Sequence, residues 1–214
     1  MATDETRDTR ERLLDEAECL FGQRGIAEVS LREITTAADA NIASVNYHFG
    51  SKAGLVRELF ARRMGPLNDE RLRLLDEIEA DAGDRPPPLE AILRIFSGPT
   101  LRMARRHPEF MMLAGRYHLD TRSECAEIMH SPDFHDLVQR IRRVLVRSFP
   151  DVAESTLWWA MHFVVGMMLH TWMGGKEMEH LSDGVAQWED DEVMIDRLVH
   201  FATAGFQRLV ELES

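Results

Sequence analysis

The stretch that decides the fold runs from Ser30 to Lys52 and reads SLREITTAADANIASVNYHFGSK. Ser30 is a good N-cap and predicts a short helix, and after a tight turn Asn41 caps a second one, which Gly50 ends. The inward positions of the first helix are Leu31, Ile34 and Ala38. Two helices of about two turns each bury too little surface to be stable alone. The pattern therefore predicts a helix-turn-helix that neighbouring elements hold, with its second helix facing outward.

The outward face of the second helix is uncharged and rich in hydrogen-bonding groups. No carboxylate occurs between residues 40 and 55, and the nearest acids are Asp39 and Glu58. A helix that lies against phosphates and base edges needs such a composition, whereas an ordinary surface helix normally carries more charge. Val45 and Phe49 face inward in this pattern. The outward residues are Ile42, Ala43, Ser44, Asn46, Tyr47 and His48.

These outward residues suggest separate contacts with a DNA duplex. Asn and Ser side chains hydrogen-bond base edges, and Ile42 and Ala43 can pack on a thymine methyl group. Tyr47 and His48 can reach phosphates, although Tyr47 could instead pack inward with Phe49. Lys52 begins the next helix, where backbone N–H groups also attract anions. Further candidates for contact with the DNA backbone lie on the first helix of the pair: Arg32, Thr35 and Thr36.

Helical periodicity extends over nearly the whole chain, and neither strand alternation nor an internal repeat interrupts it. The clearest loop is residues 83–88, whose three consecutive prolines exclude a helix. We therefore predict an all-α protein of nine or ten helices. Besides the two helices of the helix-turn-helix, they cover residues 7–24, 51–64, 89–106, 132–149, 155–173 and 191–212, with two more that begin at residues 67 and 108. Residues 121–130 are a candidate for a further short helix.

Gly65 and Pro66 predict a helix end and a domain boundary. Residues 1–65 would form an N-terminal helix-turn-helix domain, and residues 66–214 a larger C-terminal helical domain. The helix that begins at residue 67 is expected to keep its charged residues on the solvent side.

The formal net charge of −12 is unusual for a protein that binds nucleic acid. Its distribution is uneven, because residues 40–65 hold four cations and only one carboxylate, a local net charge of +3. The cations are Lys52, Arg57, Arg62 and Arg63. A locally positive surface on an acidic body can bind DNA, while the acidic remainder weakens nonspecific binding.

The two cysteines, Cys19 and Cys125, have neither metal-ligand spacing nor a CxxC pattern. This suits a reducing cytoplasm, and no disulfide is expected. The N-terminus is polar and does not resemble a signal peptide. The apolar stretch from Leu157 to Met173 contains two histidines and falls short of the about 20 residues that a membrane span needs, so it predicts a buried helix.

The sequence contains no pattern that supports catalysis. GxSxG and HExxH are absent, and Gly174-Gly175-Lys176 fails the phosphate-loop pattern because residue 170 is His and residue 177 is Glu. We therefore expect no catalytic residues, no metal and no cofactor. An all-α hydrolase or metal enzyme remains the competing class.

From Thr9 to Arg63 the chain resembles the TetR family of one-component transcriptional regulators. The match covers the opening helix TRERLLDEAECLFGQRG, the helix-turn-helix and the exit FGSKAGLVRELFARR. The form NIASVNYHFGSKAGLVRELFARRMGP, together with LWWAMHFVVGMM at residues 157–168, resembles the PsrA-like branch that responds to fatty acids or their thioesters. The family usually has Gly-Val where this chain has Asp39 and Ala40. Asp tolerates a left-handed turn, although its charge would weaken DNA binding.

The resemblance implies that the helix at residues 42–49 enters the major groove and that the C-terminal domain binds a ligand and dimerises. Met-rich clusters suit variable apolar ligands, although they more often form an ordinary core. The ligand candidates are Met103, Phe110, Met111, Arg116, His118, His162, Phe163 and Met167. A four-helix dimer interface would use the last two helices, with Trp158, Trp159, Trp172, Leu198, Phe201 and Phe206 as its anchors.

We therefore predict a cytoplasmic, homodimeric DNA-binding regulator. The simplest form is a repressor that a small apolar or acyl ligand releases from a palindromic operator. The alternative is a constitutive or ligand-activated regulator whose C-terminal domain serves only dimerisation.

Overall fold

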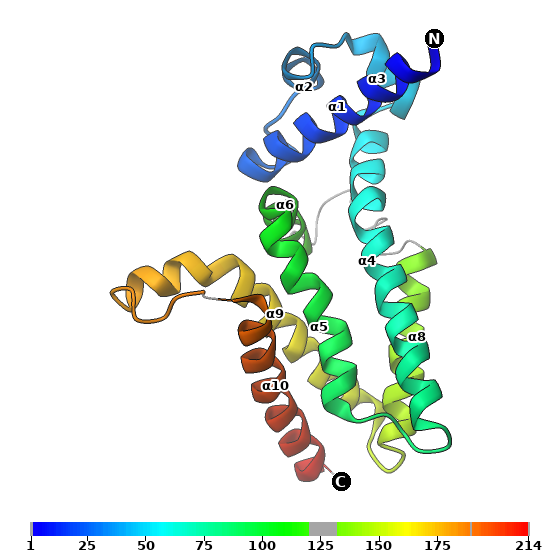
Figure 1. The fold of residues 1–214 in the computed structure, drawn as a ribbon, viewed down its shortest axis with the longest axis vertical. Helices are drawn as coiled ribbons and strands as arrows, with labels where there is room; N and C mark the ends of the chain where they lie inside the picture. The colour runs from blue at the N-terminus through cyan, green and yellow to red at the C-terminus, as the bar shows by residue number, and fades with distance from the viewer. Residues whose placement is uncertain (1, 120–131, 189, 214) are drawn as a thin grey trace. The chain divides into compact units, whose positions relative to one another are not determined.

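The computed structural model describes residues 2–119, 132–188 and 190–213, and every regular element in these ranges is an α-helix (Figure 1). The helices are α1 (Ala2–Arg24), α2 (Leu31–Ala37), α3 (Ile42–Phe49), α4 (Lys52–Ala82), α5 (Leu89–Arg106), α6 (Pro108–Leu119), α8 (Pro132–Ser148), α9 (Glu154–Leu181) and α10 (Asp191–Glu213). The all-α prediction is confirmed. The short helix predicted at residues 121–130 lies outside the described residues. Within them, no helix is both long and apolar enough to cross a membrane.

Helix α4 continues through the position where the sequence predicted its end. It contains Pro66 and ends at Ala82, so the predicted end at Met64 is wrong. A proline inside a helix removes one backbone hydrogen bond. The side chains that follow it, Leu67 and Asn68, are both buried, and their packing offsets this loss.

Helix α9 also runs farther than predicted. It passes through Gly174 and Gly175, although the pair predicted an end after Met173. A Cβ built at Gly175 would lie 3.2 Å from the indole of Trp188, so glycine lets the following loop fold back closely onto the helix.

The chain divides into two compact units. The first unit contains residues 1–66 and the segment that begins at His107, which includes α6. The second contains the rest of α4 from Leu67, followed by α5, α8, α9 and α10. Helix α6 thus belongs to the unit that carries the helix-turn-helix, whereas the sequence placed it in the C-terminal domain.

Helix α1 is the centre of the first unit. A Cβ at its Gly22 would lie 2.4 Å from the carbonyl oxygen of Glu109, so only glycine permits this approach of α6. The Phe60 ring meets Phe110 edge-on at 5.2 Å and lies 5.0 Å from Tyr117. The core of the helix-turn-helix part consists of Leu13, Leu14, Ala17, Phe21, Val29, Ile34, Ala38, Val45, Phe49, Leu55, Val56, Leu59 and Phe60.

A buried carboxylate joins α1 to α4 within this unit. Glu18 accepts hydrogen bonds from Arg62 Nη2 at 2.7 Å and from Arg63 Nε at 2.9 Å. Arg62 also donates to Asp15 at 2.8 Å. One acidic side chain thus compensates two guanidinium groups, and all three would be costly to bury alone.

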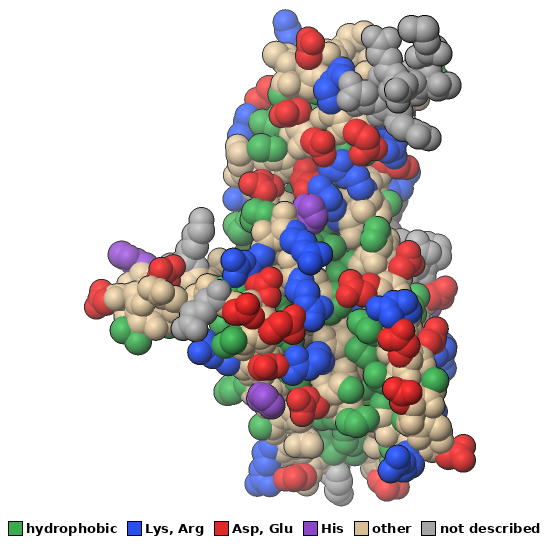
Figure 2. Space-filling view, in the orientation of Figure 1, with side chains coloured by type: hydrophobic (Ala, Val, Ile, Leu, Met, Phe, Trp, Pro, Cys, Tyr) green, Lys and Arg blue, Asp and Glu red, His purple; other side chains and the backbone are tan. Residues whose placement is uncertain are grey.

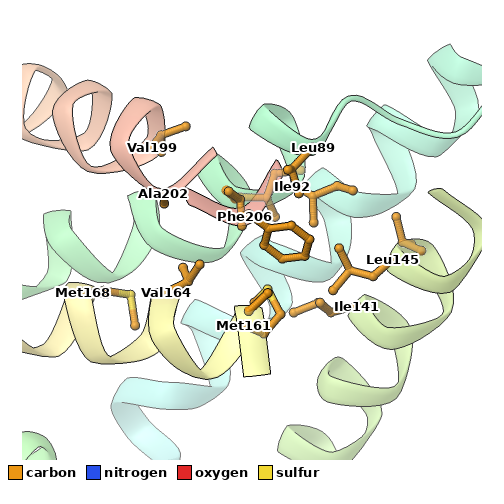
Figure 3. Packing of buried hydrophobic residues seen from close by; sticks show 14 of the residues in the cluster. Leu89, Ile92, Ile141, Leu145, Met161, Val164, Met168, Val199, Ala202 and Phe206 are labelled. Carbon is orange, nitrogen blue, oxygen red and sulfur yellow. The ribbon is translucent and has the colours of Figure 1, made fainter. Parts of the chain in front are cut away.

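The second unit has a continuous apolar core to which α4, α5, α8, α9 and α10 all contribute (Figure 3). The core residues that Figure 3 labels are Leu89, Ile92, Ile141, Leu145, Met161, Val164, Met168, Val199, Ala202 and Phe206. Outside the core, basic and acidic side chains alternate over α5 and α10 (Figure 2), where Arg102 donates to Glu192 at 2.8 Å.

The Glu18→Gln substitution tests the ion-pair cluster of the first unit. We expect it to destabilise the unit by about 2–4 kcal/mol, because two largely buried guanidinium groups lose their charged acceptor. Urea denaturation followed by far-UV circular dichroism measures the effect. The control is Glu77→Gln, whose pair with Arg73 is exposed and should contribute less than about 1 kcal/mol. Equal effects of the two substitutions would contradict this assignment.

Candidate nucleic-acid interface

Helix α2 begins with a reciprocal cap. The Ser30 hydroxyl accepts the Glu33 backbone N–H at 3.2 Å, and the Glu33 carboxylate accepts the Ser30 backbone N–H at 2.8 Å. The Ser30 hydroxyl also donates to this carboxylate at 2.7 Å, and Arg24 donates to it at 2.7 Å. The bonds that the carboxylate accepts from the Ser30 N–H, the Ser30 hydroxyl and Arg24 lower the pKa of Glu33 from 4.5 to about 2. Because the pKa is lowered on folding, the cap stabilises α2 fully above pH 4.5 and loses this effect as the pH falls toward 2.

The turn between α2 and α3 depends on Asp39, which has a φ of 47° in the left-handed region. The Ala40 N–H donates to the Thr35 carbonyl at 2.9 Å and closes the end of α2 across this residue. Arg12 of α1 donates through Nε to the Ala38 carbonyl at 3.0 Å. The turn predicted from the sequence therefore forms with Asp in the position that favours glycine, and α1 holds it in place.

Helix α3 is capped at both ends by its own sequence. Asn41 Oδ1 accepts the Ser44 backbone N–H at 2.9 Å and the Ser44 hydroxyl at 3.2 Å. At the other end, Gly50 has a φ of 73° and its N–H donates to the Asn46 carbonyl at 3.1 Å. Between these caps, Val45 and Phe49 are buried, as predicted.

The other face of α3 is open to solvent. Tyr47 is 78% exposed and Ile42 is 53% exposed, and Ala43 and Asn46 are exposed beside them. The Tyr47 ring meets His48 edge-on at 5.0 Å. The alternative position for Tyr47, packed inward with Phe49, is therefore wrong. These side chains form an uncharged surface that can donate and accept hydrogen bonds and pack on methyl groups.

The start of α4 fixes the orientation of α3. A Cβ at Gly54 would lie 1.9 Å from the carbonyl oxygen of Phe49, so a glycine is required for this junction. The Ser51 hydroxyl caps α4 by accepting the Gly54 N–H at 3.0 Å. Arg10 of α1 lies over the Phe49 ring at 5.8 Å and pairs with Glu58 of α4 at 2.6 Å. Helix α3 is thus held from both sides while its outer face stays free.

Lys52 makes contacts within the protein in addition to the predicted phosphate contact. Its ammonium donates to the Ile26 carbonyl at 2.5 Å and lies 5.7 Å from the centre of the Phe21 ring. An ammonium group has three N–H donors, so the remaining two are available to a phosphate. The lysine therefore ties the loop after α1 to the start of α4.

The remaining DNA candidates differ in their exposure. Arg32 and Thr36 of α2 are exposed, whereas Thr35 is buried and its hydroxyl donates to the Arg32 carbonyl at 3.1 Å. Thr35 therefore satisfies its hydroxyl within its own helix. Arg62 and Arg63, which the sequence counted toward a positive surface, are paired with acidic residues of α1. Their charge is neutralised locally, so the local excess of +3 overstates the positive charge available to DNA.

The predicted ligand residues fall in different units. Four lie on α6 in the first unit, with Phe110 and Met111 buried and Arg116 and His118 exposed. Four lie in the second unit, with Met103 and Met167 partly buried and His162 and Phe163 exposed. Neither unit on its own brings the eight residues together.

The predicted dimer anchors also divide into two groups. Trp158, Trp159 and Phe201 are 44%, 59% and 74% exposed. Leu198 and Phe206 are buried in the core of their own unit, and Trp172 is packed partly against that core. Only the first three present an apolar surface to a partner.

Sequence reasoning missed the residues that hold the helix-turn-helix in place. Arg10, Arg12 and Gly54 make these contacts, and none was a candidate. An isolated glycine within a helical pattern indicates a close backbone approach, so Gly54 could have been found. Arg10 and Arg12 carry no such signal, because their positions in the sequence do not distinguish them from ordinary arginines on a helix surface.

Two family models match this chain. The model described as "Bacterial regulatory proteins, tetR family" matches residues 13–59. The model described as "Tetracyclin repressor-like, C-terminal domain" matches residues 94–205, just over half of the chain. The two matches together cover both the helix-turn-helix and most of the second unit.

Individual relatives agree with these matches. The probable HTH-type transcriptional regulator YttP of Bacillus subtilis (strain 168) is 39% identical over 51 residues, which are 24% of this chain and 25% of that protein. The HTH-type transcriptional regulator AcrR of Shigella flexneri is 38% identical over 56 residues, 26% of each chain. The matched part thus spans about a quarter of the length of these curated relatives.

Among solved structures, a TetR-family transcriptional regulator from Bordetella parapertussis 12822 is similar with a TM-score of 0.63 and 15% identity. The alignment covers 90% of this chain and 93% of the other. At this identity the likeness concerns the fold alone. The chain belongs to the TetR family of DNA-binding transcriptional regulators.

Proposed function

We propose that this regulator is a cytoplasmic repressor that binds a palindromic operator as a homodimer and is released by a small apolar or acyl ligand. The observation that carries the proposal is the α3 face, which is exposed and uncharged while the residues beneath it are buried. Binding of the purified protein to the DNA that flanks its own gene is the primary test. Salt-sensitive binding is expected, and the absence of binding to any such fragment would contradict the proposal.

An exposed aromatic patch on the second unit supports the dimer. Trp159 of α9 lies 6.1 Å from Phe163 and 5.6 Å from His162, ring centre to ring centre. Phe201 of α10 and Trp158 of α9 are also exposed. Such a set of large aromatic side chains is typical of protein–protein interfaces and unusual on a free surface. A symmetric dimer would present two α3 helices, and these can read the two half-sites of a palindrome when they lie about 34–36 Å apart.

The release mechanism that we propose is a population shift. A ligand in the C-terminal domain would favour dimers whose α3 helices are wrongly spaced for the operator. Helix α4 contributes residues to both units, and we assign the coupling to this helix. The resemblance to the PsrA-like branch supports an acyl ligand. The alternative remains a constitutive or ligand-activated regulator whose second unit serves only dimerisation.

Asn46→Ala tests base recognition by α3. Asn46 is exposed, and its amide can form two hydrogen bonds with adenine. We expect the substitution to lower affinity for the preferred sequence by about 1–3 kcal/mol and to relax preference at one base position. Fluorescence anisotropy with a set of operator variants measures both effects. Gln207→Ala, at an exposed position of α10, is the control and should leave the preference intact.

Lys52→Ala tests phosphate contact. We expect it to weaken binding to all DNA sequences alike and to reduce the salt slope by about one unit, because one counterion fewer is released. Anisotropy titrations at several salt concentrations give the slope. Since Lys52 also holds the Ile26 carbonyl, the melting temperature must be measured in parallel. A stability loss with an unchanged salt slope would assign Lys52 a structural role alone.

Trp159→Asp tests the proposed dimer. A charge at this position, beside the Phe163 ring, should convert the dimer to monomers and weaken operator binding at least about tenfold, because each monomer presents only one α3 helix to the operator. Light scattering after size-exclusion chromatography gives the mass. Val146→Asp is the control, since this exposed valine lies on α8 outside the patch. A dimer that persists with Asp at position 159 would place the interface elsewhere.

A further inference from the structure

A buried arginine without a charged partner lies in the second unit. Arg71 of α4 is 3% exposed, between the buried side chains of Leu67 and Leu75 one turn to either side. The sequence pattern predicted that the charges of this helix face solvent, and for Arg71 that prediction is wrong. Arg71 lies four residues from both Leu67 and Leu75, so helical periodicity places it on the same inward face. Its burial could therefore have been predicted from the sequence.

The hydrogen-bond acceptors of Arg71 are all neutral. Nη2 donates to the Phe96 carbonyl at 2.6 Å and to the Thr100 hydroxyl, and Nη1 donates to Asn68 Oδ1 at 3.4 Å. The guanidinium also lies 4.8 Å from the centre of the Phe96 ring. Other arginines of this unit differ, because Arg102 and Arg140 each pair with a carboxylate. In the part of the chain that the structure describes, no carboxylate lies within ion-pair distance of Arg71.

Not every N–H donor of Arg71 has a hydrogen-bond acceptor. A guanidinium has five N–H donors, and the three bonds above use three of them. Nε is buried and has no hydrogen-bond partner among the described residues. The hydroxyl of Ser97, one turn before Thr100 on α5, is likewise buried and without a partner there. Two helices thus direct polar groups into an otherwise apolar region and leave some of them unsatisfied.

Burial does not remove the positive charge of Arg71. Desolvation lowers its pKa to about 10, with the charge of exposed Glu70 acting in the opposite direction. The side chain is therefore still protonated near neutral pH. A buried cation with neutral partners and open donors is costly, and such groups are normally compensated by an anion.

A purely structural role explains these observations less well. Arg71 does tie α4 to α5 through the Phe96 carbonyl, but a neutral side chain could form that contact without the cost of burying a charge. We propose that Arg71, with Asn68 and Thr100 beside it, binds the carboxylate of an organic acid whose apolar part packs among the surrounding core side chains. The inference rests on the proposed ligand-responsive function and specifies the chemical class of its ligand.

Paired probes of equal chain length test this site. Sodium decanoate and 1-decanol share their apolar part and differ in charge, so calorimetric titration isolates the contribution of the carboxylate. We expect the full-length protein to bind decanoate at least about tenfold more tightly than decanol, as one charge-assisted hydrogen bond would give. Arg71→Met should abolish this preference and leave decanol affinity within about twofold. Arg73→Met, two residues away on the exposed side of α4, is the matched control and should keep the preference.

Two results would overturn the proposal: no preference for decanoate in the unaltered protein, or the same preference with Met at position 71. Arg71→Lys decides the matter if Arg71→Met does not fold, because lysine keeps the charge and changes the geometry. It should weaken decanoate binding several-fold and leave decanol binding unchanged. An equal change for both probes would assign Arg71 to packing alone.

Operator release separates this inference from the proposed function. The same variants are titrated with decanoate while bound to operator DNA. If decanoate releases the operator from the unaltered protein but not from Arg71→Met, the result supports both the site and the release mechanism. Decanoate binding through Arg71 without release keeps the site and contradicts the release mechanism. Release that is equal in the unaltered protein and in Arg71→Met keeps the mechanism and overturns the site.

Discussion

The fixed position of a two-turn helix is the constraint on which the DNA-binding unit depends. Helix α3 is too short to be stable alone, and its orientation comes from the close approach of Gly54 to the Phe49 carbonyl. Val45 and Phe49 anchor the inner face, and Arg10 covers the Phe49 ring. Since these contacts use only the inner face and the two ends of the helix, the outer face remains available for recognition.

Electrostatics play a smaller part in this surface than the sequence suggested. Between residues 9 and 66 the chain has eight cations and eight carboxylates, so this region has no net charge. Arg62 and Arg63 are committed to Glu18, and Asp39 places a negative charge at the turn before α3. Attraction to DNA therefore depends on where the charges lie, with carboxylates excluded from α3 itself. Arg71 presents the opposite case, a charge that the second unit buries without compensation.

The sequence predicted the features that local chemistry determines. The caps at Ser30 and Asn41, the left-handed turn at Asp39 and the inward pair of Val45 and Phe49 all follow from short-range patterns, and the structure confirms them. Features that depend on tertiary packing were missed. Pro66 remains inside a helix because buried neighbours follow it, and α6 joins the first unit through contacts at Gly22. Thr35 and Lys52 share the spacing of surface residues, yet Thr35 is buried with its hydroxyl bonded inside α2, and Lys52 donates to the Ile26 carbonyl of another segment.

Hydroxyl-radical footprinting of the protein, with and without DNA from the region upstream of its gene, tests the central claim most directly. Tyr47 is 78% exposed and should be oxidised readily in the free protein. The account predicts that DNA protects Tyr47 strongly, while Trp159, assigned to the dimer contact, shows the same reactivity in both samples. Equal oxidation of Tyr47 with and without bound DNA would contradict the claim that the outer face of α3 is the recognition surface.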